Sequence, residues 1–534
     1  MIPIEERLQG RGIRRIDSLL ISGLALIGMA LTFWSTTNGP GYDSDGVVYY
    51  IGAKNILTGH GYSAPALLEL GLHIHNFTAG ADYINNKPIG YFPPLFSLSI
   101  ATFSYLGMDP SDSVRYINII LYGLNILIVF YLIKLTPHNY YISPLVGTLF
   151  MLNPGMIALH SSTLSEPLFL FFGFAALYLL FKYQSSYNRL YLIISGCCFV
   201  LSTLTRYVGI SFFLTGVASL LFFRKREVIQ RLIDATILSI IYIIPLTVWS
   251  LRNIWLADTL TGRKISIHLI GLEPLMKYLE KFTKWFFVSN YLTIGLLSIT
   301  ITSIVIIYYT HKYKSIPTLL WPRFGFNIND MLVVFIVIYS VILIITCCFL
   351  DNLITNDRLD PRFFVPIFIA TIPLLTSIFD KLVCLQPFKV FKSIFIMCFL
   401  IIMIFQGINS LKYCHSAHLN GIGLASISWK NSDTFEYIKK LPSDVKIFAN
   451  RPETILLLTG RPASRLPYIR EPLTLFPNKY YEMELDYLIN QSNGIIVWFI
   501  NLGNRHVLPE NTLTNTNKIY LIEKTQDSRI YKIK

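Results

Sequence analysis

The stretch RGIRRIDSLLISGLALIGMALTFW, residues 11–34, decides the class and the orientation of the whole chain. Its apolar part, residues 16–34, is close to the roughly 20 residues that a helix needs to cross a bilayer. The run is too long for the apolar core of a cleavable signal peptide, so we expect it to remain as a first membrane-spanning helix. Because cytoplasmic flanks are enriched in basic residues, the end that carries Arg7, Arg11, Arg14 and Arg15 is expected inside, and the segment from Thr36 outside.

The composition extends this conclusion to all 534 residues. Hydrophobic residues make up 53% of the chain and charged residues only 14%, whereas an ordinary soluble domain has about 25% charged residues. These values exclude a soluble enzyme, a disordered chain and a disulfide scaffold. The formal net charge of +14 is explained by basic inner anchors and by an amphipathic outer stretch at residues 261–285, so nucleic acid is not expected as a partner.

Apolar runs predict an α-helical polytopic membrane protein of about eleven spans, with the N-terminus inside and the C-terminus outside. Residues 92–106 form an apolar run that is too short and opens with Pro93-Pro94, so we interpret it as a juxtamembrane or re-entrant helix. Counting it as a span would place the basic cluster Arg224–Arg231 outside. The predicted spans after the first are residues 116–135, 142–159, 167–181, 190–205, 207–223, 232–251, 286–309, 331–350, 363–379 and 393–407.

A change of composition near Lys412 predicts two domains. Residues 1–411 form the transmembrane domain, in which residues 36–115 are the first external loop and carry juxtamembrane helices. Residues 412–534 alternate strand and helix patterns, which predicts an extracytoplasmic α/β domain. The expected strands are residues 445–448 and 494–500, and the expected helices are residues 432–441 and 480–491.

Two carboxylates, Asp43 and Asp45, follow the first span in the sequence Pro40-Gly-Tyr-Asp-Ser-Asp-Gly46. Such a pair can share a divalent cation, or one member can act as a general base while the other orients it. The alternative is that Ser44 or Asp45 only caps a helix that starts at Gly46. No metal site is assigned elsewhere, because the seven cysteines lack Cys-x-x-Cys spacing and the set His73, His75 and Asp82 lacks a further ligand.

The wider pattern around Asp45 carries a family resemblance. Asp45 is followed by Tyr49 and Ala53, and then in order by Gly59-x-Gly61-Tyr62, Tyr91-x-Pro93-Pro94-Leu95, Ser165-Glu166-Pro167, Leu204-Thr205-Arg206, Leu251-Arg252-Asn253, Arg362-Phe363-x-x-Pro366, and Asn450-x-Pro452 to Thr459-Gly460-Arg461. Over most of the chain, these motifs resemble the polyprenol-phosphate-sugar glycosyltransferases of the GT-C superfamily. The group in question is related to dolichyl-phosphate-mannose-protein mannosyltransferase and to the aminoarabinose transferase of lipid A.

The resemblance implies that a carboxylate of the first external loop is the catalytic base, and Asp45 matches that position. Relatives often carry Glu where this chain has Gly46, so Asp43 is the candidate for the second acid, or that acid is absent. The implied reaction passes a sugar from a polyprenyl phosphate to a lipid, glycan or protein acceptor at the outer or lumenal face, with inversion.

Transfer from a lipid phosphate also needs positive charge beside the leaving group. The candidate phosphate-binding residues, all near outer span ends, are Lys87, Arg206, Arg252 and Arg362. The alternative for each of them is that it only anchors its span at the membrane interface. Arg362 could also join a salt-bridge network with Asp357, Arg358 and Asp360. Glu166 opens an apolar span, so it is expected either to be catalytic, to have a cationic partner, or to occupy a first helical turn behind Ser165. The tyrosines assigned to an acceptor or lipid surface are Tyr49, Tyr62 and Tyr91.

The competing functional class is a transporter or flippase of lipid-linked sugars. A transporter places ionisable groups near the bilayer midplane, whereas the residues selected here lie at outer span ends. A third hypothesis is an inactive relative whose C-terminal domain only binds a partner. The lack of an external cysteine pair and the short termini favour a bacterial inner membrane, with the site facing the periplasm or the exterior. The sequon Asn76-Phe77-Thr78 would matter only in a eukaryotic secretory membrane.

Overall fold

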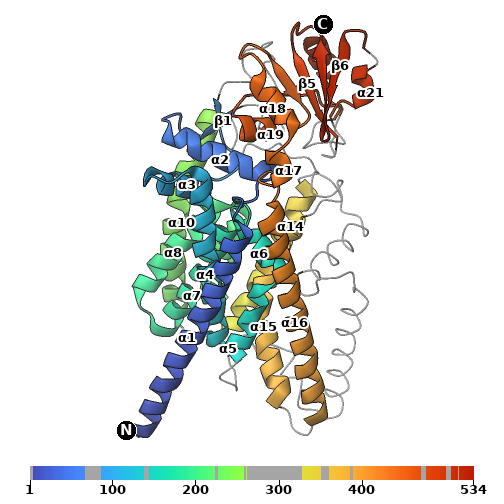
Figure 1. Cartoon of the computed structure of the whole chain (residues 1–534). Helices are drawn as coiled ribbons and strands as arrows, with labels where there is room; N and C mark the ends of the chain where they lie inside the picture. Colours follow the sequence, from blue (N-terminus) through green and yellow to red (C-terminus); the bar gives the residue numbers. More distant parts are fainter. Residues whose placement is uncertain are drawn as a thin grey trace.

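The computed structural model shows a helical bundle with a small α/β unit at one end (Figure 1). The residues that it describes are 4–65, 86–136, 143–222, 226–257, 260, 285, 327–349, 360–384, 389–470, 477–500, 507–514 and 516–534. Some features predicted from the sequence lie outside these residues: the span 286–309, the amphipathic stretch up to residue 284, the His73, His75 and Asp82 set, the sequon at 76–78, and Asp357 with Arg358.

Six helical segments of the described residues are long and apolar enough to cross a membrane. They lie in α1 (Ile4–Ser35), α4 (Pro110–Leu135), α7 (Glu166–Ser186), α10 (Val228–Ala257), α14 (Ile328–Phe349), and η5 (Pro361–Phe364) continued by α15 (Val365–Cys384). Two shorter apolar helices, α8 (Arg189–Thr205) and α9 (Ile210–Phe222, after η3 at Tyr207–Gly209), coincide with further predicted spans. The chain is therefore an integral membrane protein. The count of about eleven spans and the N-in, C-out orientation stay predictions.

Two helical segments differ from the sequence-based boundaries. The predicted span 142–159 is divided into α5 (Ser143–Thr148), η2 (Leu149–Leu152) and α6 (Pro154–His160). Pro154 lacks an N–H and starts a new helix, which the Asn153 side chain caps by accepting from the Met156 N–H at 2.9 Å. Helix α16 (Lys389–Asn420) runs past the expected domain boundary at Lys412. Its buried residues Cys414 and Ala417 continue the packing there, so the composition changes before the helix ends.

Helices α2 (Ser44–Leu57) and α3 (Leu95–Tyr105) lie at the end of the bundle that faces the α/β unit (Figure 1). The short α3, with 11 residues, occupies the run for which a juxtamembrane or re-entrant helix is expected. Val47 of α2 and Phe96 of α3 are fully buried and share one apolar cluster with Val114 of α4. Between α2 and α3, strand β1 (Ser63–Pro65) pairs antiparallel with β2 (Asn86–Pro88).

The α/β unit contains one mixed sheet with the strand order β4-β3-β5-β7-β6. Strand β3 (Ile447–Ala449) runs parallel to β4 (Ser464–Arg465) and β5 (Ile495–Phe499), whereas β7 (Ser528–Ile533) is antiparallel to β5 and to β6 (Ile519–Lys524). The described helices of this region are α17 (Ile427–Lys430), α18 (Asp433–Lys440), α19 (Pro452–Thr459), α20 (Tyr481–Ile489) and α21 (Glu510–Thr514). Strands β3 and β5 occupy the two predicted strand segments, and α18 and α20 the predicted helices.

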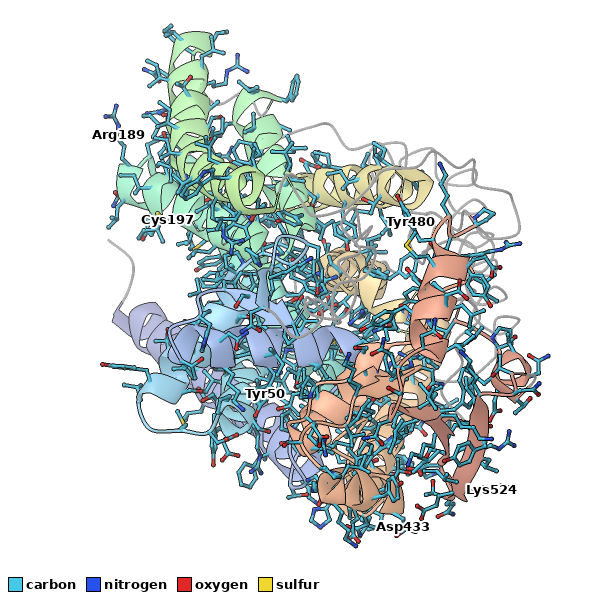
Figure 2. All side chains as sticks on the ribbon, turned by 90° about the horizontal axis from the view of Figure 1, so that it is seen from above. Tyr50, Arg189, Cys197, Asp433, Tyr480 and Lys524 are labelled. Carbon is cyan, nitrogen blue, oxygen red and sulfur yellow. The ribbon has the colours of Figure 1, made fainter. Side chains whose placement is uncertain are left out.

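The sheet is buried on both faces at its strands β3 and β5. Ile447 and Val497 belong to one apolar cluster, and the neighbouring residues Phe448 and Ile496 belong to another, as the alternation of side chains along a strand requires. Seen from above, Asp433 and Lys524 of the unit lie on the opposite side of the view from Arg189 and Cys197 of α8 (Figure 2). The unit therefore covers one side of the end of the bundle.

Three segments that are distant in sequence meet just before α2. Gly41 pairs with Ser162 and Tyr42 pairs with Gly423, both as parallel bridges. The Thr163 N–H donates to the Gly41 carbonyl at 2.7 Å, and the Leu424 N–H donates to the Tyr42 carbonyl at 3.1 Å. These bonds fix the entry to α2 between the α6–α7 connection and the segment that leads into the α/β unit.

Gly46 is the contact point between α2 and the α6–α7 connection, so Gly46→Ala is expected to destabilise the protein. A Cβ at this position would lie 2.9 Å from the Thr163 carbonyl oxygen, and overpacking of this kind costs about 1–3 kcal/mol. Gly407→Ala is the matched control, since nothing lies within 4 Å of a Cβ there. Thermal unfolding in detergent measures both. Equal thermal midpoints for Gly46→Ala and Gly407→Ala would contradict the close contact between Gly46 and Thr163.

Candidate active site

Both predicted acids lie at the N-terminal end of α2. Asp43 is the N-cap, and its Oδ1 accepts from the Gly46 N–H at 2.7 Å. The cap is therefore Asp43 and not Ser44 or Asp45, because only Asp43 precedes the helix with an extended backbone. Asp45 lies inside the first turn, where the helix dipole favours a negative charge.

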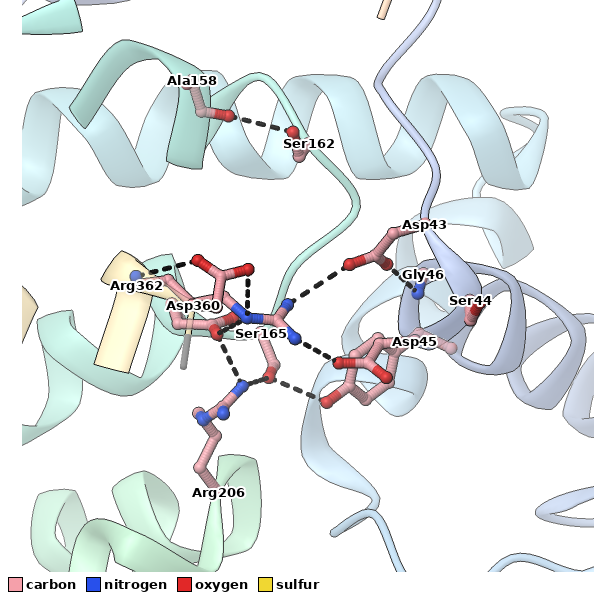
Figure 3. A network of polar contacts seen from close by, with 12 residues as sticks. Asp43, Ser44, Asp45, Gly46, Ala158, Ser162, Ser165, Arg206, Asp360 and Arg362 are labelled. Atoms are coloured by element: carbon pink, nitrogen blue, oxygen red, sulfur yellow. Dashed lines mark hydrogen bonds and ion pairs between the residues drawn. The ribbon is translucent and has the colours of Figure 1, made fainter. Parts of the chain in front are cut away.

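Arg362 lies among four carboxylates (Figure 3). Its Nη2 is 2.7 Å from Asp45 Oδ2, and its Nη1 is 3.3 Å from Asp43 Oδ2. The Nε atom lies 3.5 Å from Glu166 Oε1 and 3.4 Å from Asp360 Oδ2. Asp360 also caps η5, since its Oδ1 accepts from the Arg362 N–H at 3.0 Å. One guanidinium thus joins α2, the start of α7 and the start of η5.

A second arginine completes the network around Glu166. The Glu166 side chain is only 4% exposed, and its Oε1 lies 2.8 Å from Arg206 Nη1. The same nitrogen donates to Ser165 Oγ at 3.2 Å, and Ser165 Oγ lies 2.9 Å from the Tyr49 hydroxyl. Ser165 makes no capping bond with its side chain, so its hydroxyl links Tyr49 to Arg206 instead. Glu166 therefore has cationic partners in Arg206 and Arg362 and also occupies the first turn of α7, so two of the three alternatives for this position hold together.

The network holds more negative than positive formal charge, four carboxylates against two guanidiniums. Burial and the charge of Asp45 raise the pKa of Asp43 to about 7, although Arg362 and the Gly46 N–H act in the opposite direction. Because 48% of the Asp43 side chain stays exposed, water screens part of this repulsion. Asp43 is thus the carboxylate of the network whose pKa is raised toward neutral pH, so it binds a proton more readily than an ordinary aspartate.

This proton uptake predicts a pH dependence of stability. The folded-state pKa of Asp43, about 7, lies above the ordinary value of 3.8, so folding binds a proton between these values and stability falls as pH rises through them. Asp43→Asn keeps a residue that caps helices equally well but cannot titrate. We expect the thermal midpoint of the wild type to fall more steeply from pH 5 to pH 8 than that of Asp43→Asn. Parallel pH profiles would show that Asp43 is not the titrating group.

The remaining predicted residues lie outside this network. Lys87 is exposed on β2 and contacts no acid among the described residues. Arg252 donates to the carbonyls of Ile89 and Tyr62 at 2.7 and 2.9 Å, so its guanidinium is used to hold the β1–β2 region against α10. The Tyr62 hydroxyl donates to the Phe92 carbonyl at 3.3 Å. Tyr91 is buried beside Phe92.

Two residues of the network were not selected as site residues from the sequence. Ser165 was interpreted as a helix cap and Asp360 as a salt-bridge partner of Arg362, and both interpretations depend on local position alone. The Asp360-Pro361 pair does carry a capping signal, because proline favours the first turn behind an N-cap. No local signal predicts that the Ser165 hydroxyl faces Tyr49.

Among the described residues, no group of three or more His, Cys, Asp or Glu side chains is placed to hold a metal ion. Both aspartates contact the Arg362 guanidinium, which supplies the positive charge that a shared cation would otherwise bring. A divalent cation at Asp43 and Asp45 stays an untested expectation.

The comparisons with known proteins concern the fold. The sequence matches no family model, and no curated protein matches it. The structure is similar to ArnT from Cupriavidus metallidurans bound to undecaprenyl phosphate, with a TM-score of 0.55 and 12% identity over 96% of this chain and 97% of that one. For ArnT in the apo state the TM-score is 0.54, with 11% identity over 97% and 98%. An oligosaccharyltransferase of Archaeoglobus fulgidus gives a TM-score of 0.48, with 12% identity over 89% and 67%.

The similarity to ArnT extends over nearly the full length of both chains, so it includes the bundle and the C-terminal α/β unit. Identities of this size establish similarity of fold and nothing finer. The resemblance to the GT-C superfamily that the sequence motifs indicated is therefore confirmed at the level of the fold.

Proposed function

We propose that the protein is a membrane glycosyltransferase that moves a sugar from a polyprenyl phosphate to a hydroxyl of a lipid, glycan or protein acceptor. The observation that carries this proposal is the 2.7 Å contact between Asp45 and Arg362, which joins a candidate base to a candidate phosphate-binding cation. Arg206 and Glu166 complete the same cluster. The shared fold of ArnT, a protein whose structure contains undecaprenyl phosphate, supports the choice of donor.

The location of the cluster favours chemistry at the membrane surface. Glu166 is the first residue of α7, and Arg362 lies in η5 directly before α15, so both stand at ends of apolar helices. A lipid phosphate lies at that depth while its chain remains in the hydrocarbon. By the proposed orientation, this end of the bundle faces the periplasm or the exterior of a bacterial inner membrane.

Each residue then has a role in an inverting displacement. Asp45 accepts the proton of the acceptor hydroxyl while that oxygen bonds to the anomeric carbon. The bond from the anomeric carbon to the donor phosphate oxygen breaks, and its electron pair leaves with the polyprenyl phosphate. Arg362 and Arg206 stabilise the leaving phosphate, because charge-assisted bonds from guanidinium to phosphate are strong and geometrically specific. Glu166 orients both arginines.

The spare hydrogen-bonding capacity of Arg206 supports this assignment. Its two polar contacts with described residues, Glu166 and Ser165, both use Nη1. A guanidinium has five N–H donors, so Nη2 and Nε can donate to phosphate oxygens without breaking the network. Asp43 is the second acid of the site, taking the place of the Glu that relatives often carry at Gly46. Lys87, Arg252, Tyr62 and Tyr91 stay proposals for the rim of the donor or acceptor site.

The proposal is tested in vesicles that contain the purified protein and a panel of undecaprenyl-phosphate-linked hexoses and pentoses. A glycosyltransferase consumes one of these donors and releases undecaprenyl phosphate together with a glycosylated acceptor. A transporter would move the donor to the other leaflet without cleaving it. Donors that all remain intact in the presence of lipid, glycan and peptide acceptors would overturn the proposed function.

A further inference from the structure

The C-terminal α/β unit reaches the candidate active site through four residues, Ser44, Arg451, Glu453 and Arg465, which we call the Glu453 clamp. Ser44 Oγ donates to Glu453 Oε1 at 3.1 Å. Arg451 Nη1 donates to Ser44 Oγ at 3.3 Å and to Glu453 Oε1 at 3.2 Å. Since Ser44 stands between the two candidate acids in sequence, the clamp holds the turn that carries both of them.

Glu453 is a rigid and charged anchor. Its side chain is 3% exposed, and its second oxygen, Oε2, accepts from Arg465 Nη2 at 3.0 Å. Burial alone would raise the pKa of Glu453, but Arg465 and Arg451 lower it below the ordinary value, so the group remains a carboxylate. Arg465 lies on β4, opposite Ala449 of β3, which ties the clamp to the sheet.

The α/β unit has other attachments to this end of the bundle. Tyr42 pairs with Gly423 through the backbone, and Leu456 and Leu457 of α19 pack against the apolar cluster that contains Val47. A buried ion cluster is weak evidence of stability, because the desolvation of its charges offsets much of their attraction. The clamp is therefore not needed to attach the α/β unit to the bundle, and its specific effect is to position Ser44.

We propose that Glu453 is a positioning residue for sugar transfer, which acts through Ser44 to orient the first turn of α2 toward Arg362. This inference rests on the proposed function. Successive helical residues point about 100° apart, so a fixed Ser44 also fixes the direction of Asp45. Asp43 is the N-cap directly before Ser44, so the same contact holds the backbone to which Asp43 is joined. Figure 3 shows Ser44 beyond the two aspartates as seen from Arg362. Displacing a reacting group by about 1 Å can lower the rate about 100-fold.

The kinetic test uses Ser44→Ala, which removes the link but leaves the contacts of Glu453 with Arg451 and Arg465 intact. We expect kcat to fall about 10- to 100-fold with the KM of the donor unchanged, because the lost contact orients the base and does not bind the donor. Ser44→Thr keeps a hydroxyl and is expected to retain activity. Combining Ser44→Ala with Glu453→Gln should lower kcat no further than Glu453→Gln alone, since both act through one contact.

The matched control is Glu510→Gln, which changes a carboxylate of the same unit that is bound to Arg529 and Tyr531 and does not belong to the clamp. A readout independent of turnover is amide hydrogen exchange of residues 44–50. Exchange should accelerate in Ser44→Ala and Glu453→Gln but not in Glu510→Gln. Wild-type exchange and kcat in a folded Ser44→Ala variant would overturn the inference. A wild-type protein that cleaves none of the donors would instead overturn the proposed function, while the exchange comparison would still test the clamp.

Discussion

Asp45→Asn is expected to lower kcat for sugar transfer by about 100- to 10,000-fold, the range that general-base catalysis supplies. Asparagine keeps the shape of the side chain but cannot take the proton of the acceptor hydroxyl. In the structure, Asp45 Oδ2 is bound to Arg362, whereas the side chain remains 22% exposed, so its other oxygen can meet an acceptor. The measurement is release of undecaprenyl phosphate at saturating donor.

The control for this variant is Asp486→Asn, which makes the same change at an exposed position of α20. It should keep wild-type turnover. Binding of undecaprenyl phosphate should persist in Asp45→Asn, because the base does not contribute positive charge to the phosphate site. Wild-type turnover in a folded Asp45→Asn protein would exclude Asp45 as the base.

Arg362→Met is expected to cause the largest loss of stability at the site. The substitution leaves Asp43, Asp45 and the buried Glu166 without their shared counter-charge. Removing one partner from a buried ion pair costs about 3–5 kcal/mol. Affinity for undecaprenyl phosphate should also fall roughly tenfold or more, since a charge-assisted hydrogen bond contributes about 1.5–3 kcal/mol.

Arg529→Met provides the comparison for Arg362→Met. Arg529 pairs with Glu510 in the α/β unit, but the two side chains are 37% and 21% exposed, so water screens the pair and its loss should destabilise the protein far less. Thermal unfolding in detergent and binding of undecaprenyl phosphate measure both variants. Adding Asp43→Asn to Arg362→Met should recover part of the stability by removing one of the repelling carboxylates. Equal effects of Arg362→Met and Arg529→Met would contradict the central role of Arg362.

The candidate site could be predicted in part because its residues are chemically unusual where they stand. A carboxylate at the start of an apolar span, such as Glu166, is costly unless it has a partner or a function. The acids Asp43 and Asp45 follow the first span directly, so they are expected at the membrane surface. The sequence does not show which of the four candidate cations lies beside the acids. Arg252 and Arg362 both lie near span ends, yet Arg252 binds backbone carbonyls and Arg362 binds carboxylates.

Hydrophobic runs and the local sequence pattern determined the membrane class and most helix positions, because the transfer of a side chain from water to lipid depends on that side chain and its near neighbours. Local patterns also predicted the strands β3 and β5 and the helix behind Ser432. Only the tertiary structure decided which charges meet. Asp45 and Arg362 are 317 positions apart, and the packing that places the start of α2 next to η5 brings their side chains within 2.7 Å. Neither that packing nor the hydrogen bond from Ser44 to Glu453 has a local signature, since both join segments that are distant in sequence.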